Sequence, residues 1–349
     1  MNAPGAMNIH AHPAWFGSVM GTAGFAVAVI SQAEAWDIPA LGVVSMILMI
    51  SASGLALALW PRYMRRLARN HELGKELSDP AHGAMLATFP AGLLVLAVAW
   101  GKVGPELIPA GIAIWIDIVL AVLGTVVAFA LSAAWATSIA RSGVGLEGVN
   151  GGWLIPPVMN LIVPLTLIPV MGYYPHAAPT LIIIAGVFYG IGVVLFIVML
   201  TLLIARLALR EPLPGPMAPS LWIPLAPAGI LGLSLLRIAQ SGAASGMLPT
   251  GFVSVAGLFA AMGIGFGIWW SAFAYLDLRR VRQAKALPYH PGWWGFVFPV
   301  AAMSLSITAV GATFSLTWVL VLAAIVTLLL AGIWLLVAVR TMKALAAAR

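Results

Sequence analysis

Long apolar runs separated by short polar connections make up most of the chain. Each run holds about 20 residues or more, the length that an α-helix needs to cross a hydrocarbon layer about 30 Å thick. Apolar residues do not alternate with polar ones within the runs, which argues against the strands of a membrane barrel. The pattern predicts an all-α integral membrane protein with ten transmembrane helices, near residues 14–32, 39–60, 84–101, 111–136, 153–172, 178–205, 221–240, 251–276, 293–313 and 317–340.

Composition supports a membrane protein. With 62% hydrophobic and 8% charged residues, the 349-residue chain has too little polar surface to cover a water-soluble globule. Residues 1–13 hold no Lys or Arg and end in no small-residue cleavage site, so they do not read as a signal peptide. The chain has no cysteine, which excludes disulfides and thiolate chemistry.

Basic residues fall on alternate connections. Of the 17 Lys and Arg residues, 15 follow the even-numbered predicted helices, and the other two are Lys102 and Arg237. Because Lys and Arg stay on the cytoplasmic side of membranes, both termini should be cytoplasmic. We therefore expect one transmembrane domain over 1–349 in the cell (plasma or inner) membrane, with cytoplasmic tails at 1–13 and 341–349. The net charge of +7 then reports topology and not nucleic-acid binding.

A helix-breaking residue recurs near the start of every second predicted helix. The five segments read "WFGSVMGTAG" from 15, "MLATFPAGLL" from 85, "WLIPPVMNLI" from 153, "WIPLAPAGIL" from 222 and "WWGFVFPVAA" from 293. Their breaker residues are separated by 69, 67, 70 and 72 positions, and they are Gly21, Pro90, Pro157, Pro227 and Pro299. This spacing predicts five copies of a helical hairpin.

The breaker residues also predict how the hairpins are arranged. A proline inside a helix removes one donor, frees a carbonyl and bends the axis. Within lipid such backbone is tolerated where protein or a water-filled cavity surrounds it. Five breakers at one depth therefore place the odd-numbered helices together around a centre, with the even-numbered helices outside. The alternative is that these prolines merely kink the helices for packing.

Four segments resemble the tellurite-resistance/dicarboxylate transporter family. That family includes bacterial tellurite-resistance permeases, fungal malate and sulfite transporters and plant slow anion channels. The resemblance implies five quasi-symmetric hairpins around a central pore, a homotrimer with one pore per subunit, and anions as permeants. The segments are "PAWFGSVMGTAGFAV" (13–27), "GWLIPPVMNLIVP" (152–164), "APSLWIPLAPAGILG" (218–232) and "GWWGFVFPVAAMS" (292–304).

The resemblance also implies a gate. In family members a phenylalanine on the ninth helix, just before its kink, plugs the pore, and the matching residue is Phe298. Pro299 would turn this ring into the lumen, where an apolar constriction resists hydrated ions. The alternative is a ring packed between helices. Phe89 precedes Pro90 in the same way and is the repeat-equivalent candidate for a lumen residue.

The predicted inner helices lack fixed negative charge, which favours anions as permeants. The odd-numbered spans contain no Asp, Glu or His, and their N-termini carry partial positive charge. Arg237 either snorkels to lipid headgroups or attracts anions at the outer vestibule. Asp117, on an outer helix, is expected to have a structural role, paired either with Arg237 or with a neighbouring hairpin.

We do not expect an enzyme, a cofactor or a metal site. The odd-numbered spans lack the paired carboxylates or nucleophile–histidine sets of membrane enzymes. The segment "HELGKELSDPAH" (71–82) has Lys75 where a zinc peptidase needs its second histidine. His10 and His12 are expected in a mobile tail. A cytoplasmic aromatic belt is expected from Trp15, Trp153, Trp222, Trp293 and Trp294.

Two transport mechanisms stay open. One is a gated anion channel or facilitative transporter with a phenylalanine-plugged pore. The other is a proton-linked carrier for C4-dicarboxylates such as malate, or an exporter of sulfite or tellurite. Because the inner spans hold no titratable group, the sequence favours facilitated flow. The expected partners are small anions, inorganic or dicarboxylate, membrane lipid and further copies of the chain.

Overall fold

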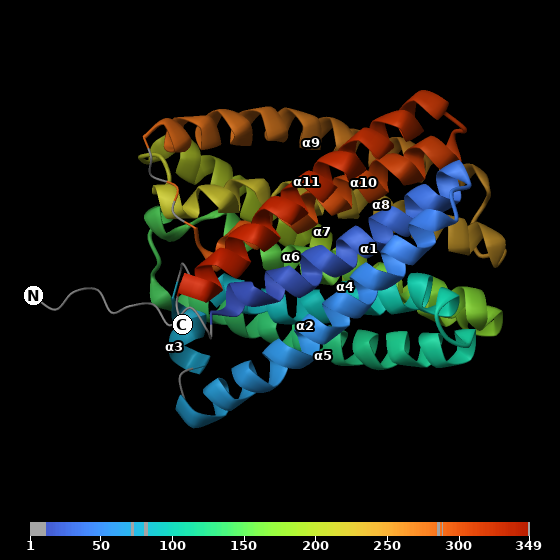
Figure 1. The fold of residues 1–349 in the computed structure, drawn as a ribbon, viewed down its shortest axis with the longest axis horizontal. Helices are drawn as coiled ribbons and strands as arrows, with labels where there is room; N and C mark the ends of the chain where they lie inside the picture. Colours follow the sequence, from blue (N-terminus) through green and yellow to red (C-terminus); the bar gives the residue numbers. More distant parts are fainter. Residues whose placement is uncertain (1–11, 71–72, 80–82, 285–286, 288, 348–349) are drawn as a thin grey trace, which may run out of the picture.

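Five antiparallel helical hairpins form the bundle (Figure 1). The computed structural model describes residues 12–70, 73–79, 83–284, 287 and 289–347. Within these residues ten helices are long and apolar enough to cross a membrane, and no strand is present, which confirms the predicted fold class. The hairpins are α1 (Phe16–Trp36) with α2 (Ala40–Asn70), α4 (Thr88–Val103) with α5 (Ala110–Ser142), α6 (Ile155–Tyr173) with α7 (Ala178–Leu209), α8 (Leu225–Ala244) with α9 (Gly251–Gln283), and α10 (Val297–Thr313) with α11 (Thr317–Ala347). A short helix, α3 (Leu73–Ser78), precedes the second hairpin.

The first helix of each hairpin belongs to a closed inner ring. In α1, α4, α6, α8 and α10, between 78% and 94% of the apolar span is buried, against 17–33% in the second helices. Each inner helix contacts two others, in the order α1, α4, α6, α8, α10 and back to α1. The outer helices instead expose large apolar side chains such as Leu57, Val126 and Leu328. Apolar side chains facing outward are stable in lipid, so the alternation of inner and outer helices has the predicted form.

The two ends of the bundle differ in their connections and charge. At one end, here called the hairpin face, short turns join the two helices of each hairpin, and three of them use left-handed residues, Asp37, Gly246 and Ser315. The opposite end, the terminal face, is where the described chain begins and ends (Figure 1). There the outer helices continue past the inner ring and carry basic side chains, including Arg62, Arg141, Arg206, Arg280 and Arg340.

A short 3₁₀ segment leads into each inner helix at the terminal face. These entry segments are η2 (Pro13–Trp15), η3 (Gly83–Ala87), η6 (Gly151–Leu154), η8 (Gly215–Trp222) and η9 (Pro291–Phe296). They are rich in Pro and Gly, which suit tight turns and poorly support a regular α-helix. The inner α-helices are consequently shorter than their outer partners: α10 has 17 residues and α11 has 31.

The four breaker prolines do not kink the middle of their helices, contrary to our expectation. Each is the third residue of its α-helix, at Pro90, Pro157, Pro227 and Pro299. The first-turn N–H groups of a helix have no intrahelical acceptor, so a proline there removes no helical hydrogen bond. These prolines therefore mark the change from entry segment to α-helix. The fifth breaker, Gly21, allows α10 to approach, because a Cβ there would lie 3.0 Å from Val297 Cβ.

The expected aromatic belt is wrong for three of its five tryptophans. Trp15, Trp153 and Trp294 are buried, whereas Trp222 and Trp293 are half-buried. The reason is that the start of each inner helix is enclosed by the longer outer helices and does not meet the lipid interface.

Candidate functional site

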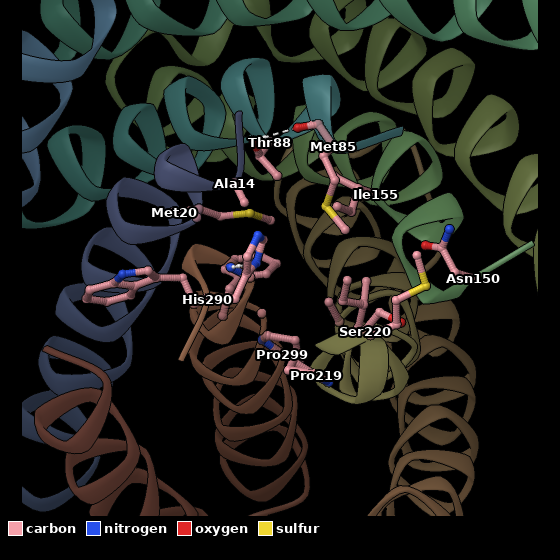
Figure 2. Close-up of a pocket in the computed structure, with 18 of the residues that line it drawn as sticks. Ala14, Met20, Met85, Thr88, Asn150, Ile155, Pro219, Ser220, His290 and Pro299 are labelled. Carbon is pink, nitrogen blue, oxygen red and sulfur yellow. Dashed lines mark hydrogen bonds between the residues drawn. The ribbon is translucent and has the colours of Figure 1, made fainter. Parts of the chain in front are cut away.

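A cavity of about 230 Å³ opens among the entry segments at the terminal face (Figure 2). We call it the terminal cavity. Its polar side chains come from five segments of the chain, one at the start of each hairpin: His12, Thr88, Asn150, Ser220 and His290. Its remaining lining is apolar and includes side chains from α1, α6 and α10, among them Met20, Val158 and Phe298.

Backbone amides orient the polar side chains of this cavity. The Nδ1 atoms of His12 and His290 accept hydrogen bonds from the amides of Ala14 and Gly292, at 3.1 and 3.0 Å. The two imidazole rings meet edge to face with their centroids 4.8 Å apart. Because Nδ1 is an acceptor in each ring, the neutral imidazole carries its proton on Nε2. His12 is thus a buried part of the bundle, and our expectation of a mobile tail was wrong for this residue; His10 lies outside the described residues.

Asn150 and Ser220 extend this pattern to two further segments. Asn150 Oδ1 accepts from the amide of Gly152 at 2.9 Å, and Ser220 Oγ accepts from the amide of Gly151 at 3.3 Å. A sequence signal for these positions existed, since His12, Asn150 and His290 each precede the local breaker residue by seven to nine positions. Their recurrence as N-caps of the entry segments was overlooked.

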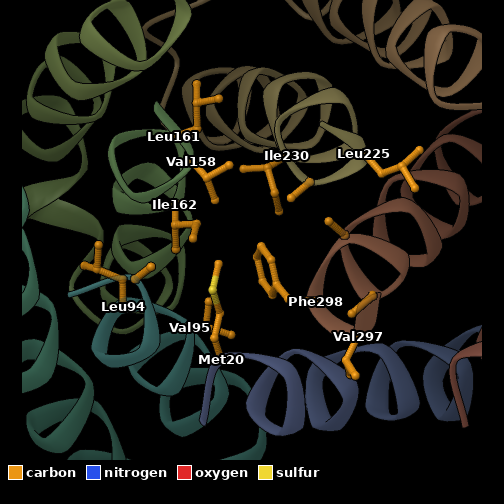
Figure 3. Close-up of a cluster of buried hydrophobic side chains, with 14 of the residues drawn as sticks. Met20, Leu94, Val95, Val158, Leu161, Ile162, Leu225, Ile230, Val297 and Phe298 are labelled. Carbon is orange, nitrogen blue, oxygen red and sulfur yellow. The ribbon is translucent and has the colours of Figure 1, made fainter. Parts of the chain in front are cut away.

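Phe298 lies at the inner end of the terminal cavity. Its side chain is 4% exposed, and a Cβ added to Gly24 of α1 would lie 3.1 Å from its Cδ2. Figure 3 views the inner helices end-on, with the ring directed into the space between them. Met20, Val158 and Ile230 point toward the same space from α1, α6 and α8 (Figure 3). These four side chains form what we call the apolar layer.

Phe89 lies in different surroundings. Its ring packs against Phe16 of α1 and Trp60 of α2, with centroids 4.9 and 5.4 Å apart, and a third neighbour is Tyr63 of α2. It does not line the terminal cavity. The alternative we had kept open, a ring packed between helices, describes this residue.

Pro299 lines the terminal cavity, but the other four breaker residues do not. The cavity is instead lined by Met20, Val158 and Ala226, each next to its breaker, and by Thr88, two residues before Pro90. Adjacent residues of an α-helix point about 100° apart, so a breaker and its neighbour face different directions. The repeat spacing therefore points to the turns that border the terminal cavity, but it does not identify which side chain of each turn lines it.

A second polar cluster lies at the opposite end of the inner ring, at the hairpin face. Lys102 of α4 forms an ion pair with Glu34 of α1 at 2.9 Å and donates a hydrogen bond to Ser31 at 3.0 Å. Arg237 of α8 donates to Gln240 at 2.9 Å, and Gln240 donates to Thr313 of α10 at 3.2 Å. Glu34 was missed because α1 continues to Trp36, beyond the predicted end of this span at residue 32.

Asp117 and Arg237, whose pairing we had left open, are not paired. Both carboxyl oxygens of Asp117 are buried without a hydrogen-bond partner among the described residues. The carboxyl group lies against α4 and α6, because a Cβ on Gly101 would contact both Asp117 and Pro169.

Comparison with known proteins shows similarity along most of the chain. A family model described as a voltage-dependent anion channel matches residues 10–342. Two uncharacterized transporters of Methanocaldococcus jannaschii are 28% and 29% identical, over 83% and 82% of this chain and 80% of each relative. The sulfite efflux pump SSU1 of Arthroderma otae is 25% identical, over 93% of this chain and 88% of its own.

These matches confirm the family resemblance that four short segments suggested. The matched region includes all five inner helices and extends into every outer helix. The protein therefore belongs to the SLAC1 family of voltage-dependent anion channels.

Proposed function

We propose that the protein is a gated anion channel or facilitative anion transporter. The proposed path follows the axis of the inner ring, from the terminal cavity through the apolar layer to the hairpin-face cluster. The observation that carries the proposal is the position of Phe298, whose ring occupies the inner end of the cavity within a closed ring of helices. An apolar plug at that point opposes the entry of hydrated ions until it moves aside.

Fixed charges and dipoles support anions as the permeants. The inner helices begin at the terminal cavity, so the partial positive charge of their N-termini is directed toward it. At the other end, Lys102 and Arg237 outnumber the one carboxylate of their cluster, Glu34, while Asp37 and Glu106 lie exposed in the turns of that face. The helix N-termini and the two cations of the cluster both favour an anion over a cation on this path.

One specific observation favours sulfite over the other candidate anions. Similarity to sulfite efflux pumps over 93% of the chain makes sulfite the first substrate to test. The proton-linked malate carrier is the second candidate. The apolar layer of Met20, Val158, Ile230 and Phe298 has no titratable group, whereas the terminal cavity holds His12 and His290, so a coupled proton would cross the layer itself on the substrate.

The proposal includes the setting of the protein. The basic residues of the terminal face support a cytoplasmic location for that face and for both termini, in the cell membrane. The assembly that the family resemblance implies is a homotrimer with one pore per subunit.

Reconstitution into liposomes tests the function. We expect flux of chloride, nitrate, sulfite or malate and none of sodium or potassium, with a reversal potential near that of the anion under a salt gradient. Repeating the flux with and without a pH gradient separates facilitated flow from proton-linked transport. A reversal potential near that of the cation, or no ion flux from correctly assembled protein, would contradict the proposal.

A further inference from the structure

Three charged side chains lie near one another where the inner helices end at the hairpin face. Glu34 is paired with Lys102 at 2.9 Å, and Arg237 lies close enough for its charge to act on both groups without contacting them. They belong to α1, α4 and α8, three of the five helices of the inner ring. One carboxylate therefore neutralises one of two cations, and the group keeps a net positive charge.

Neutral hydrogen bonds hold this group inside the ring. Gln32 Nε2 donates to Thr308 of α10 at 2.8 Å, and Arg237 is tied to α10 through Gln240 and Thr313. An arginine that snorkels to lipid would extend away from the bundle. Arg237 instead bonds within it, which argues against the snorkelling alternative.

The two cations retain capacity to bind another anion. A guanidinium has five N–H donors. Among the described residues, the hydrogen-bond partner of the Arg237 guanidinium is Gln240. Lys102 is bound to Glu34 and Ser31. The ammonium is the less exposed member of the ion pair, with 24% of its side chain exposed against 59% for Glu34. The carboxylate can therefore swing into water while the ammonium stays in place.

We propose that Lys102 and Arg237 form a binding site for a small inorganic anion, and that Glu34 is a tethered competitor for it. Without a bound anion the carboxylate occupies the site, and an arriving anion displaces it into water. Exposed ion pairs are weak, so this exchange needs no tightly binding anion. The inference rests on the proposed function only in placing the site on a conduction path, since binding itself is independent of conduction.

Binding is tested on the purified full-length protein by anion-dependent thermal stabilisation. Sodium nitrate replaces sodium gluconate at constant ionic strength, so that general salt screening does not change. We expect Glu34→Gln to lower the half-saturating nitrate concentration about two- to fivefold, because a near-isosteric neutral side chain no longer competes. Lys102→Gln and Arg237→Gln should each weaken or abolish the nitrate-dependent stabilisation.

A matched control lies at the other face. Glu147 forms an ion pair with Arg210 at 2.8 Å, with exposed fractions of 62% and 49%. Glu147→Gln removes a similar carboxylate far from the proposed site and should leave the nitrate titration unchanged. A Glu34→Gln titration that coincides with wild type, or an equal shift in Glu147→Gln, would overturn the proposal.

The result is separable from the proposed function. If wild type conducts no anion in liposomes but Glu34→Gln still binds nitrate more tightly than wild type, the binding site stands and the channel proposal fails. If wild type conducts anions and Glu34→Gln titrates as wild type does, the channel proposal stands and the site fails. Because Glu34→Gln is expected to gain affinity, loss of folded protein cannot imitate the result.

Discussion

Two phenylalanines that each precede a first-turn proline have different neighbours. Phe298 adjoins the terminal cavity, whereas Phe89 packs on aromatic side chains of α1 and α2. The difference lies in the rotation of each inner helix about its own axis. That rotation is determined by the neighbours available to each ring, which for Phe89 include Trp60 on α2, the outer helix of the preceding hairpin.

Phe298→Ala should increase anion flux severalfold at unchanged expression. Removing the ring widens the apolar layer, whose dewetting opposes the entry of ions. Phe298→Leu should give an intermediate increase, because an aliphatic side chain narrows the space without filling it. The measurement is liposome flux per correctly assembled protein.

Phe89→Ala is the matched control. Because its ring is buried between helices, truncation should reduce stability by about 3–5 kcal/mol, by analogy with soluble cores, and leave flux unchanged. The readouts are melting temperature and flux. If Phe298→Ala instead lowers the melting temperature and conducts as wild type does, the gate is refuted.

Asp117→Val should leave the melting temperature equal or raise it. We first expected a carboxylate with a packing partner, but both of its oxygens are buried without a hydrogen bond in the described part of the chain. An unsatisfied buried polar group costs about 1–3 kcal/mol, and an apolar side chain of similar shape removes that cost. Thermal unfolding in detergent checks the sign. A clear loss of stability would reveal a partner that the carboxyl group needs.

At the scale of elements, close helix crossings depend on glycine. A Cβ on Gly232 of α8 would contact the backbone of Ala260 on α9, which a side-chain rotation cannot relieve. Gly265, on the exposed side of α9, has open space around it. The two positions therefore test packing and helix propensity separately on one hairpin.

Gly232→Ala should destabilise the protein by about 1–3 kcal/mol, the usual cost of overpacking. Gly265→Ala should be neutral or stabilise it by up to about 1 kcal/mol, because alanine favours a helix more than glycine does. Melting temperatures of both variants in one detergent make the comparison. Equal melting temperatures would show that α8 and α9 can separate at this crossing at little cost.

At the scale of the whole molecule, the orientation in the membrane can be tested with single cysteines, since the chain has none. Ser245 lies exposed at the hairpin face, and Ala346 lies exposed near the end of α11 at the terminal face, so each can be replaced by cysteine. A membrane-impermeant maleimide should label the Ser245→Cys variant in intact cells. It should label the Ala346→Cys variant only after the cells are permeabilised. The reverse pattern would invert the proposed topology.

The sequence by itself determined the architecture. Ten spans, five repeats and the alternation of inner and outer helices follow from run length and the spacing of breaker residues such as Pro90 and Pro299. These are local properties, because a helix needs about 20 apolar residues to cross a bilayer whatever it packs against. The family resemblance is local in the same sense, because it depends on the residues of four short segments.

Tertiary structure decided which side chains meet. His12 and His290 meet edge to face in the lining of the terminal cavity, and Lys102 reaches Glu34, although each pair is far apart in the chain. It also decided that Phe298, and not Phe89, adjoins the cavity, and that the four breaker prolines lie in the first turns of their helices. Hydrophobic periodicity carries little information on helix rotation here, because the spans are apolar on every side. Rotation was settled by contacts between helices that are distant in sequence.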